Sequence, residues 1–163
     1  MKKKYDSDFA FRYNRKSLRL KTHNYGWSGT YFVTICANQD EPIFETPELR
    51  TILTETWESL PKRFMGATID EFVIMPDHVH LIISLEGNVE KPITLGAVMG
   101  AYKSLTTMAW LKHIKATGLE CPGIIWQVRF YERTIRDDQE LEQTRLYIRN
   151  NPIELKLKQM EET

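Results

Sequence analysis

Cysteine is scarce in this sequence. Cys36 and Cys121 are its only two cysteines, and they form no C-x-x-C pair. Two cysteines do not make a disulfide framework. A reducing, cytoplasmic setting is therefore the simplest interpretation of the composition.

Long hydrophobic runs are also missing. No apolar stretch approaches the ~20 residues that are needed to span a bilayer. The N-terminal sequence MKKKYDSDFAF is basic but leads into no apolar segment, so we do not expect a signal peptide. The sequence thus predicts no membrane partner. Its 163 residues, 42% of them hydrophobic, suit one globular domain with a sizeable core.

The chain has no excess of either charge, because 22 basic residues balance 22 acidic ones. The basic residues are unevenly spread, however. Residues 1–24 contain eight Lys or Arg against two Asp, and residues 129–149 contain five Arg. A surface with one basic side is compatible with a phosphate-backbone partner. Charge alone fits a basic tail and a solvated helix face equally well.

Hydrophobic periodicity and turn residues divide the chain into seven elements. Pro47 after Thr46 is typical of a helix start, and Pro76-Asp77 is typical of a tight hairpin turn. Asp137 is the expected N-cap of the last helix, and Pro152 its expected end. The expected elements are a strand at 30–38, a helix at 46–64, strands at 67–75 and 78–85, a helix at 94–116, a strand in the second half of 124–136, and a helix at 137–151.

This order, β-α-β-β-α-β with a further C-terminal helix, predicts an α+β fold. It is the split βαβ, ferredoxin-like pattern, in which helices cover one face of an antiparallel sheet. The other face is then expected to be free for a ligand.

The segment MPDHVHLII carries two histidines, His78 and His80, in what otherwise reads as a buried strand. Side chains alternate along a strand, so the two imidazoles point the same way while Val79 and Leu81 point into the core. Their spacing allows both rings to bind one metal ion. Two polar residues on a solvated strand face are an equally acceptable interpretation. Two ligands are not a complete metal site, so a third must come from elsewhere.

The last predicted helix offers further polar groups. Tyr147 and Asn151 are spaced i, i+4, so they share one side of the helix beside an apolar stripe of Leu141, Thr144 and Ile148. By pattern alone, a core aromatic and an ordinary helix C-terminus explain them as well as a functional role does.

Several stretches of the sequence resemble one family. The strand MPDHVHLII resembles the His-hydrophobic-His strand of the single-tyrosine HUH transposases. More specific blocks follow the order found in REP-associated tyrosine transposases and their insertion-sequence relatives. These blocks are RKSLRL (15–20), YGWSGTYFVTIC (25–36), DEFVIMPDHVHLII (70–83), GAVMGAYKS (96–104), IWQVRFYERTIRDDQEL (125–141) and YIRNNP (147–152). The resemblance covers nearly the whole chain.

The resemblance implies a role for each candidate. It assigns His78, His80 and Asn151 as ligands of a divalent metal, Mg²⁺ or Mn²⁺, and Tyr147 as the nucleophile. It also implies a basic arm at 1–29, a transposase domain at 30–152 and a short tail at 153–163. Relatives of this kind act as monomers or as homodimers, so the resemblance leaves the oligomeric state open.

The implied substrate is single-stranded or hairpin DNA. The resemblance therefore implies a cytoplasmic protein associated with the nucleoid. A 5′-phosphotyrosine intermediate would keep the phosphodiester energy for rejoining. Cationic and aromatic side chains are expected to contact the DNA backbone and bases. The candidates are Arg15, Lys16, Arg19, Lys103, Arg129, Tyr131 and Arg133.

Three other interpretations compete. A histidine-triad hydrolase needs H-x-H-x-H, but Ile82 stands at the third position. A zinc-stabilised structural domain is disfavoured by two histidines without paired cysteines. The strongest alternative is a domesticated relative that binds palindromic DNA without cutting it.

Overall fold

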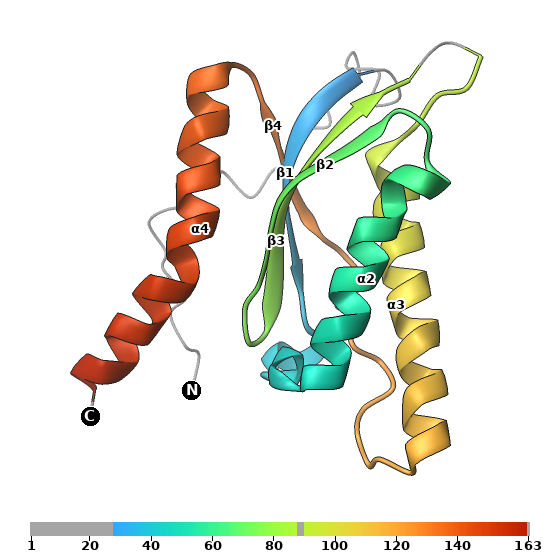
Figure 1. Cartoon of the computed structure of the whole chain (residues 1–163), viewed down its shortest axis with the longest axis vertical. Coiled ribbons are helices and arrows are strands. Elements are labelled where there is room, and N and C mark those ends of the chain that lie inside the picture. Colours follow the sequence, from blue (N-terminus) through green and yellow to red (C-terminus); the bar gives the residue numbers. More distant parts are fainter. Residues whose placement is uncertain (1–27, 88–89, 163) are drawn as a thin grey trace.

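Four antiparallel strands form one sheet in the order β2-β3-β1-β4. The computed structural model describes residues 28–87 and 90–162. Figure 1 shows the sheet between α4 on one side and α2 and α3 on the other. The elements are β1 (Ser28–Cys36), α2 (Pro47–Arg63), β2 (Ala67–Ile74), β3 (His78–Glu86), α3 (Leu95–Thr117), β4 (Tyr131–Ile135) and α4 (Asp138–Glu161), with short 3₁₀ turns at Asn38–Asp40 and Ile43–Glu45.

This strand order confirms the predicted split βαβ fold. The first α-crossover joins β1 to β2, and β3 then inserts between them, pairing with both. The two-residue turn also forms as expected, because the amide of Met75 donates to the carbonyl of His78 across Pro76-Asp77 at 2.8 Å. The sequence therefore correctly predicts which strands are neighbours in the sheet.

The face covered by α2 and α3 holds the main hydrophobic core. Leu53, Tyr102 and Leu81, from α2, α3 and β3, are fully buried there. The hydroxyl of Tyr102 donates a hydrogen bond to the carbonyl of Leu53 at 3.0 Å, and burial raises the pKa of this phenol well above its ordinary value. A buried polar group with a partner avoids the cost of an unsatisfied one.

The start of α2 differs from its prediction in one detail, whereas α4 starts as predicted. Pro47 occupies the first helical turn, but the side chain of Thr46 makes no capping hydrogen bond. In α4, Asp137 Oδ1 accepts from the amide of Glu140 at 2.8 Å. The last helix thus begins where the sequence predicted, on a capping group two residues after β4.

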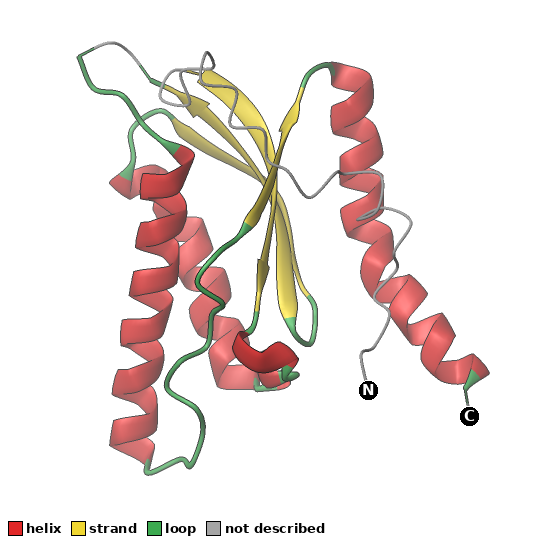
Figure 2. Ribbon diagram, turned by 180° about the vertical axis from the view of Figure 1, so that it is seen from behind, coloured by secondary structure: helices red, strands yellow, loops and turns green. Residues whose placement is uncertain are grey.

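The prediction that Pro152 ends the last helix is wrong. Helix α4 continues through Pro152 to Glu161, and Figures 1 and 2 show it changing direction along its length. Proline removes one hydrogen bond and usually kinks a helix. The residues after it, Glu154 to Lys158, are strong helix formers, so the helix resumes.

The expectation that the second face of the sheet is free is also wrong. In Figure 2 helix α4 lies across this face. Ile148 packs there against Phe32, Ile82 and Ile135 in a separate, smaller cluster. The apolar stripe of α4 requires burial, and this face of the sheet provides it.

Within the described ranges, no helix is long and apolar enough to cross a membrane.

Candidate active site

The histidine pair lies on the face of the sheet that α4 covers. His78 and His80 are both buried, and their Nε2 atoms are 3.1 Å apart. The two rings meet at 71°, with centroids 4.6 Å apart. The alternation of β3 causes this, since Val79 and Leu81 enter the main core on the opposite face. The predicted convergence of the two imidazoles is present.

Each imidazole is oriented through its other nitrogen. His78 Nδ1 bonds Asp77 Oδ1 at 2.7 Å, and His80 Nδ1 bonds Thr34 Oγ1 at 2.7 Å. Thr34 stands directly opposite His80 in the β1–β3 register. A carboxylate or hydroxyl at Nδ1 fixes the ring so that Nε2 can face a metal, as is usual for metal-binding histidines.

Burial disfavours the protonated form of His80. Burial, with a smaller contribution from the neighbouring His78, keeps the pKa of His80 well below its ordinary value. A neutral imidazole has a lone pair available for a metal ion, whereas a protonated one does not. The same burial that removes charge from His80 therefore suits it to ligation.

Tyr147 reaches this site from α4. Its ring centroid is 5.5 Å from that of His80 and 6.0 Å from that of Phe32. Ile148, the next residue, anchors the helix in the small apolar cluster beneath it. Because adjacent helix positions diverge by about 100°, burial of Ile148 turns Tyr147 toward the histidine end of the sheet.

Asn151 follows Tyr147 by one helical turn. Its Nδ2 atom is buried without a hydrogen-bond partner. A half-turn of the amide exchanges Nδ2 for the carbonyl oxygen, which is a metal-ligating group. A buried amide nitrogen that lacks a partner is unusual, and an ion or water that completes the site would explain it.

This donor set fits a divalent metal ion, provided that Asn151 takes part. Within residues 28–87 and 90–162, no cluster of three or more His, Cys, Asp or Glu is placed to hold a metal. Asp77 does not serve as the third ligand, because its carboxylate is directed at His78 Nδ1. Two imidazole nitrogens and one amide oxygen leave further positions of the ion for other oxygen ligands.

Two of the residues that were predicted to contact DNA have partners inside the protein. Arg133 forms an ion pair with Glu140, donates to Thr144 and lies 5.7 Å from the Phe32 ring. Lys103 Nζ donates to two backbone carbonyls of the segment before β4, and burial lowers its pKa. Both cations thus contribute to the fold, and contact between either of them and DNA stays a prediction.

The other predicted contacts lie elsewhere. Tyr131 is opposite Thr34 in the β1–β4 register, so it shares the face of the histidines, and it is 66% exposed. Arg129 is exposed two residues before it. Arg15, Lys16, Arg19 and the basic arm at 1–29, apart from residues 28 and 29, lie outside the described residues.

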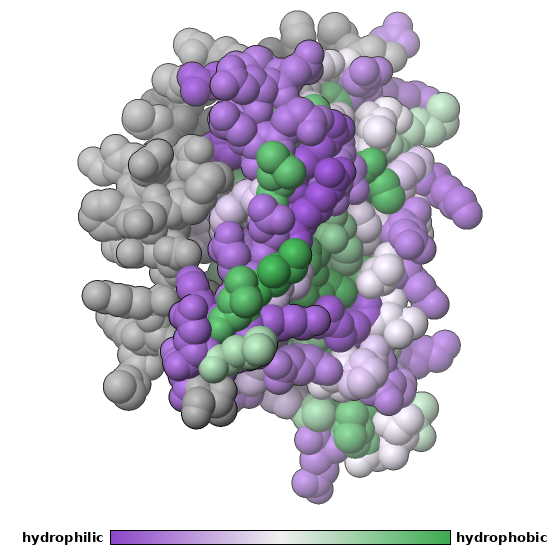
Figure 3. Space-filling view, turned by 60° about the vertical axis from the view of Figure 1, so that its left-hand side comes forward, coloured by the Kyte–Doolittle hydropathy of each residue, from purple (hydrophilic) through white to green (hydrophobic). Residues whose placement is uncertain are grey.

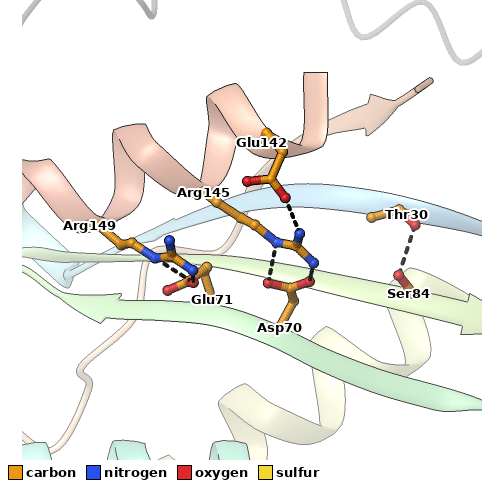
Figure 4. A network of polar contacts seen from close by, with 7 residues as sticks. All are labelled: Thr30, Asp70, Glu71, Ser84, Glu142, Arg145 and Arg149. Carbon is orange, nitrogen blue, oxygen red and sulfur yellow. Dashed lines mark hydrogen bonds and ion pairs between the residues drawn. The ribbon is translucent and has the colours of Figure 1, made fainter. Parts of the chain in front are cut away.

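Sequence reasoning missed the ion pairs that attach α4 to β2. Asp70 and Glu71 interrupt the β2–β3 register, and Figure 4 shows Arg145 and Arg149 reaching them from α4. Arg145 Nε is 3.0 Å from Asp70 Oδ1, and Arg149 Nε is 2.7 Å from Glu71 Oε1. The i, i+4 spacing of the arginines was the only signal in the sequence. We call these two pairs the helix clamp.

Comparisons with known proteins agree on one family. A family model described as "Transposase IS200 like" matches residues 26–151. A Haemophilus influenzae protein without an assigned function is 32% identical over 167 residues, covering 86% of this chain and 89% of its own. Another protein of that organism, named among the REP-associated tyrosine transposases, is 28% identical over 129 residues, covering 77% and 70%.

Solved structures share the fold. A REP-associated tyrosine transposase bound to a REP hairpin aligns with a TM-score of 0.57 at 24% identity, over 77% of this chain and 67% of that one. A Deinococcus radiodurans protein described as a transposase aligns with a TM-score of 0.53 at 16% identity, over 78% and 94%.

Proposed function

Because this chain belongs to the IS200-like transposase family, we propose that it is a metal-dependent tyrosine transposase that cuts and rejoins single-stranded or hairpin DNA. The observation that carries the proposal is the 5.5 Å between the ring centroids of Tyr147 and His80. A nucleophile beside two metal-binding imidazoles suits attack on a phosphodiester.

His78, His80 and Asn151 would hold the ion, Mg²⁺ or Mn²⁺. The support is the convergence of two Nε2 atoms and the buried amide nitrogen of Asn151 that lacks a partner. Imidazole ligands favour Mn²⁺ over Mg²⁺, so Mn²⁺ is expected to support activity at least as well in vitro. When bound, the cation supplies positive charge to a non-bridging phosphate oxygen.

Tyr147 performs the covalent step. Its phenol loses a proton to solvent and its oxygen attacks phosphorus. The bond between phosphorus and the 3′ oxygen breaks, and that oxygen takes up a proton. The products are a 5′-phosphotyrosine and a free 3′-hydroxyl. Since the link keeps the phosphodiester energy, a 3′-hydroxyl of another strand can reverse the step without ATP.

Hairpin DNA is the proposed substrate. The hairpin bound by the solved REP-associated tyrosine transposase, which shares this fold, supports the proposal. Arg129 is exposed for backbone contact and Tyr131 for base stacking. Arg15, Lys16 and Arg19 are further candidates for phosphate contact. Such a substrate would bring the protein to the nucleoid.

A cleavage assay tests the proposal. Labelled hairpin oligonucleotides from the flanks of the gene are incubated with the protein in Mn²⁺ or EDTA, then run on denaturing and native gels. We expect cleavage only with Mn²⁺, loss of cleavage in Tyr147→Phe, and retention in Tyr31→Phe, which changes a tyrosine on the opposite face.

The same gels separate the alternatives. Hairpins that shift on the native gel but stay intact would favour a DNA-binding protein that does not cut. Cleavage that persists in Tyr147→Phe would reject the assigned nucleophile. If the hairpins neither shift on the native gel nor are cleaved, both proposed functions are contradicted for these hairpins.

A further inference from the structure

The segment that leads from α3 into the edge strand β4 leaves the sheet in a bulge. Trp126 pairs with Ala37 in an isolated bridge, and Tyr131 pairs with Thr34 in the β1–β4 ladder. Between these two pairs β1 has two residues, whereas the opposite segment has four, residues 127–130. The opposite segment therefore carries two residues that the pairing does not need, and we call residues 127–130 the edge bulge.

The exposure of the side chains shows that the edge bulge turns outward. In a regular strand Trp126, Val128 and Phe130 would lie on one face. Trp126 is buried and Phe130 packs against the main core, but Val128 between them is 93% exposed. The next residue, Arg129, is also exposed. Bulges at sheet edges commonly redirect side chains beside functional sites, and this one presents an arginine to solvent.

Two side chains of α3, nearly one helical turn apart, hold this segment. Thr106 Oγ1 accepts a hydrogen bond from Trp126 Nε1 at 2.8 Å, just before the edge bulge. Lys103 Nζ donates to the carbonyls of Gln127 at 2.6 Å and Val128 at 2.9 Å, inside it. An ammonium group has three donors, so one lysine can hold two successive carbonyls at once. Figure 2 shows the segment running beside α3 before it joins β4.

The charge around the edge bulge differs from that of the α4 side of the molecule. Helix α3 has three Lys and no Asp or Glu among its 23 residues. Helix α4 carries charges of both signs, and Figure 3 shows its side of the molecule, where hydrophilic side chains surround a narrow band of hydrophobic ones. A carboxylate competes with phosphate for an arginine, and α3 has none. Arg129 therefore stands beside a helix that suits a polyanion.

We propose that Lys103 is a positioning residue for Arg129. By holding the carbonyls of residues 127 and 128, it fixes the backbone immediately before Arg129 and so fixes where that guanidinium meets the DNA backbone. Without these bonds the exposed bulge would sample more conformations, and ordering it would cost binding free energy. The inference rests on the proposed function, because it assumes that Arg129 contacts DNA. It differs from the role that the sequence predicted for Lys103, which is a direct contact between its own charge and DNA.

A double-mutant cycle on hairpin binding by the full chain separates the two roles. Lys103→Met removes the ammonium group and keeps the side-chain stem, and its bond to Val128 is exposed, so water can replace it and the variant should fold. Lys103→Met and Arg129→Gln should each weaken binding of the labelled hairpins about tenfold, and the double variant should bind no more weakly than Arg129→Gln. Lys112→Met, at an exposed lysine of the same helix, is the matched control. Losses that multiply in the double variant would overturn the proposal and favour direct contact between Lys103 and phosphate.

The kinetics of cleavage distinguish positioning from a general loss of structure. In Lys103→Met we expect the hairpin concentration for half-maximal cleavage to rise about tenfold, with a much smaller change in the maximal rate. A partly unfolded protein would instead lose maximal rate at an unchanged half-maximal concentration. That second result would overturn the proposal.

Hydrogen exchange of the free protein tests the anchoring without DNA. Amides of the edge bulge should exchange faster in Lys103→Met than in wild type or Lys112→Met, because the bulge loses its attachment to α3. Unchanged exchange would overturn the proposal. Wild type that binds no hairpin would contradict the proposed function and this role together, whereas multiplying losses or unchanged exchange would contradict this role alone.

Discussion

The two faces of the sheet are closed in different ways. Helices α2 and α3 cover one face with a large, continuous apolar core. Helix α4 closes the other face with a small apolar cluster, the largely buried Arg133–Glu140 ion pair and the helix clamp. Hydrophobic burial dominates stability, whereas exposed ion pairs contribute little and respond to salt. The first face thus supplies most of the stability, and the second holds the candidate catalytic residues on a helix that is held less firmly.

Leu53→Ala on the first face should have the largest effect on stability. Leu53 is fully buried in the main core, so its truncation leaves a cavity. We expect the free energy of unfolding to fall by about 2–5 kcal/mol, measured by urea denaturation. A loss as small as that of an exposed apolar residue such as Met65→Ala would contradict the assignment of this face as the main source of stability.

Glu140→Gln on the second face should have an intermediate effect. It removes the charge that pairs with the buried guanidinium of Arg133, while its amide oxygen can still accept from the Arg136 backbone. We expect the free energy of unfolding to fall by about 1–3 kcal/mol. Glu142→Gln, on the exposed side of the same helix, is the control and should change little. If Arg133 instead served DNA, Glu140→Gln would leave stability unchanged and strengthen DNA binding.

Loss of the helix clamp should have the smallest effect. In Asp70→Asn/Glu71→Gln we expect α4 to open slightly more easily at low salt, because both arginines of the helix clamp lose their charged partners. Hydrogen exchange of peptides from residues 138–161 in the free protein would measure this. High salt should reduce the difference between variant and wild type, since it screens the wild-type pairs. A difference that is independent of salt would mean that the two acids act through packing.

The sequence predicted the fold well because its signals are local. The Pro76-Asp77 turn and the alternation of β3 determine which neighbours pair and which side the histidines take. The ligand and nucleophile assignments came from the family resemblance, and the metal roles of His78, His80 and Asn151 stay predictions. The proximity of Tyr147 to His80 is the part that the structure adds.

The features that the sequence did not predict depend mostly on contacts between residues far apart in the chain. Only the fold shows that backbone carbonyls accept hydrogen bonds from Lys103 and that Glu140 pairs with Arg133. Contact between either cation and DNA stays a prediction. Pro152 was read as a helix end because local rules weigh its missing amide more than the helix formers after it. Asp77 gave no signal beyond standing next to His78.

Mass spectrometry of the covalent product would identify the nucleophile. The protein is trapped with a hairpin substrate in Mn²⁺, digested, and the peptide that carries the nucleotide is sequenced. We expect one modified residue, Tyr147, beside the histidine pair. A nucleotide on Tyr131, the exposed tyrosine of the same face, would contradict the claim that α4 carries the nucleophile.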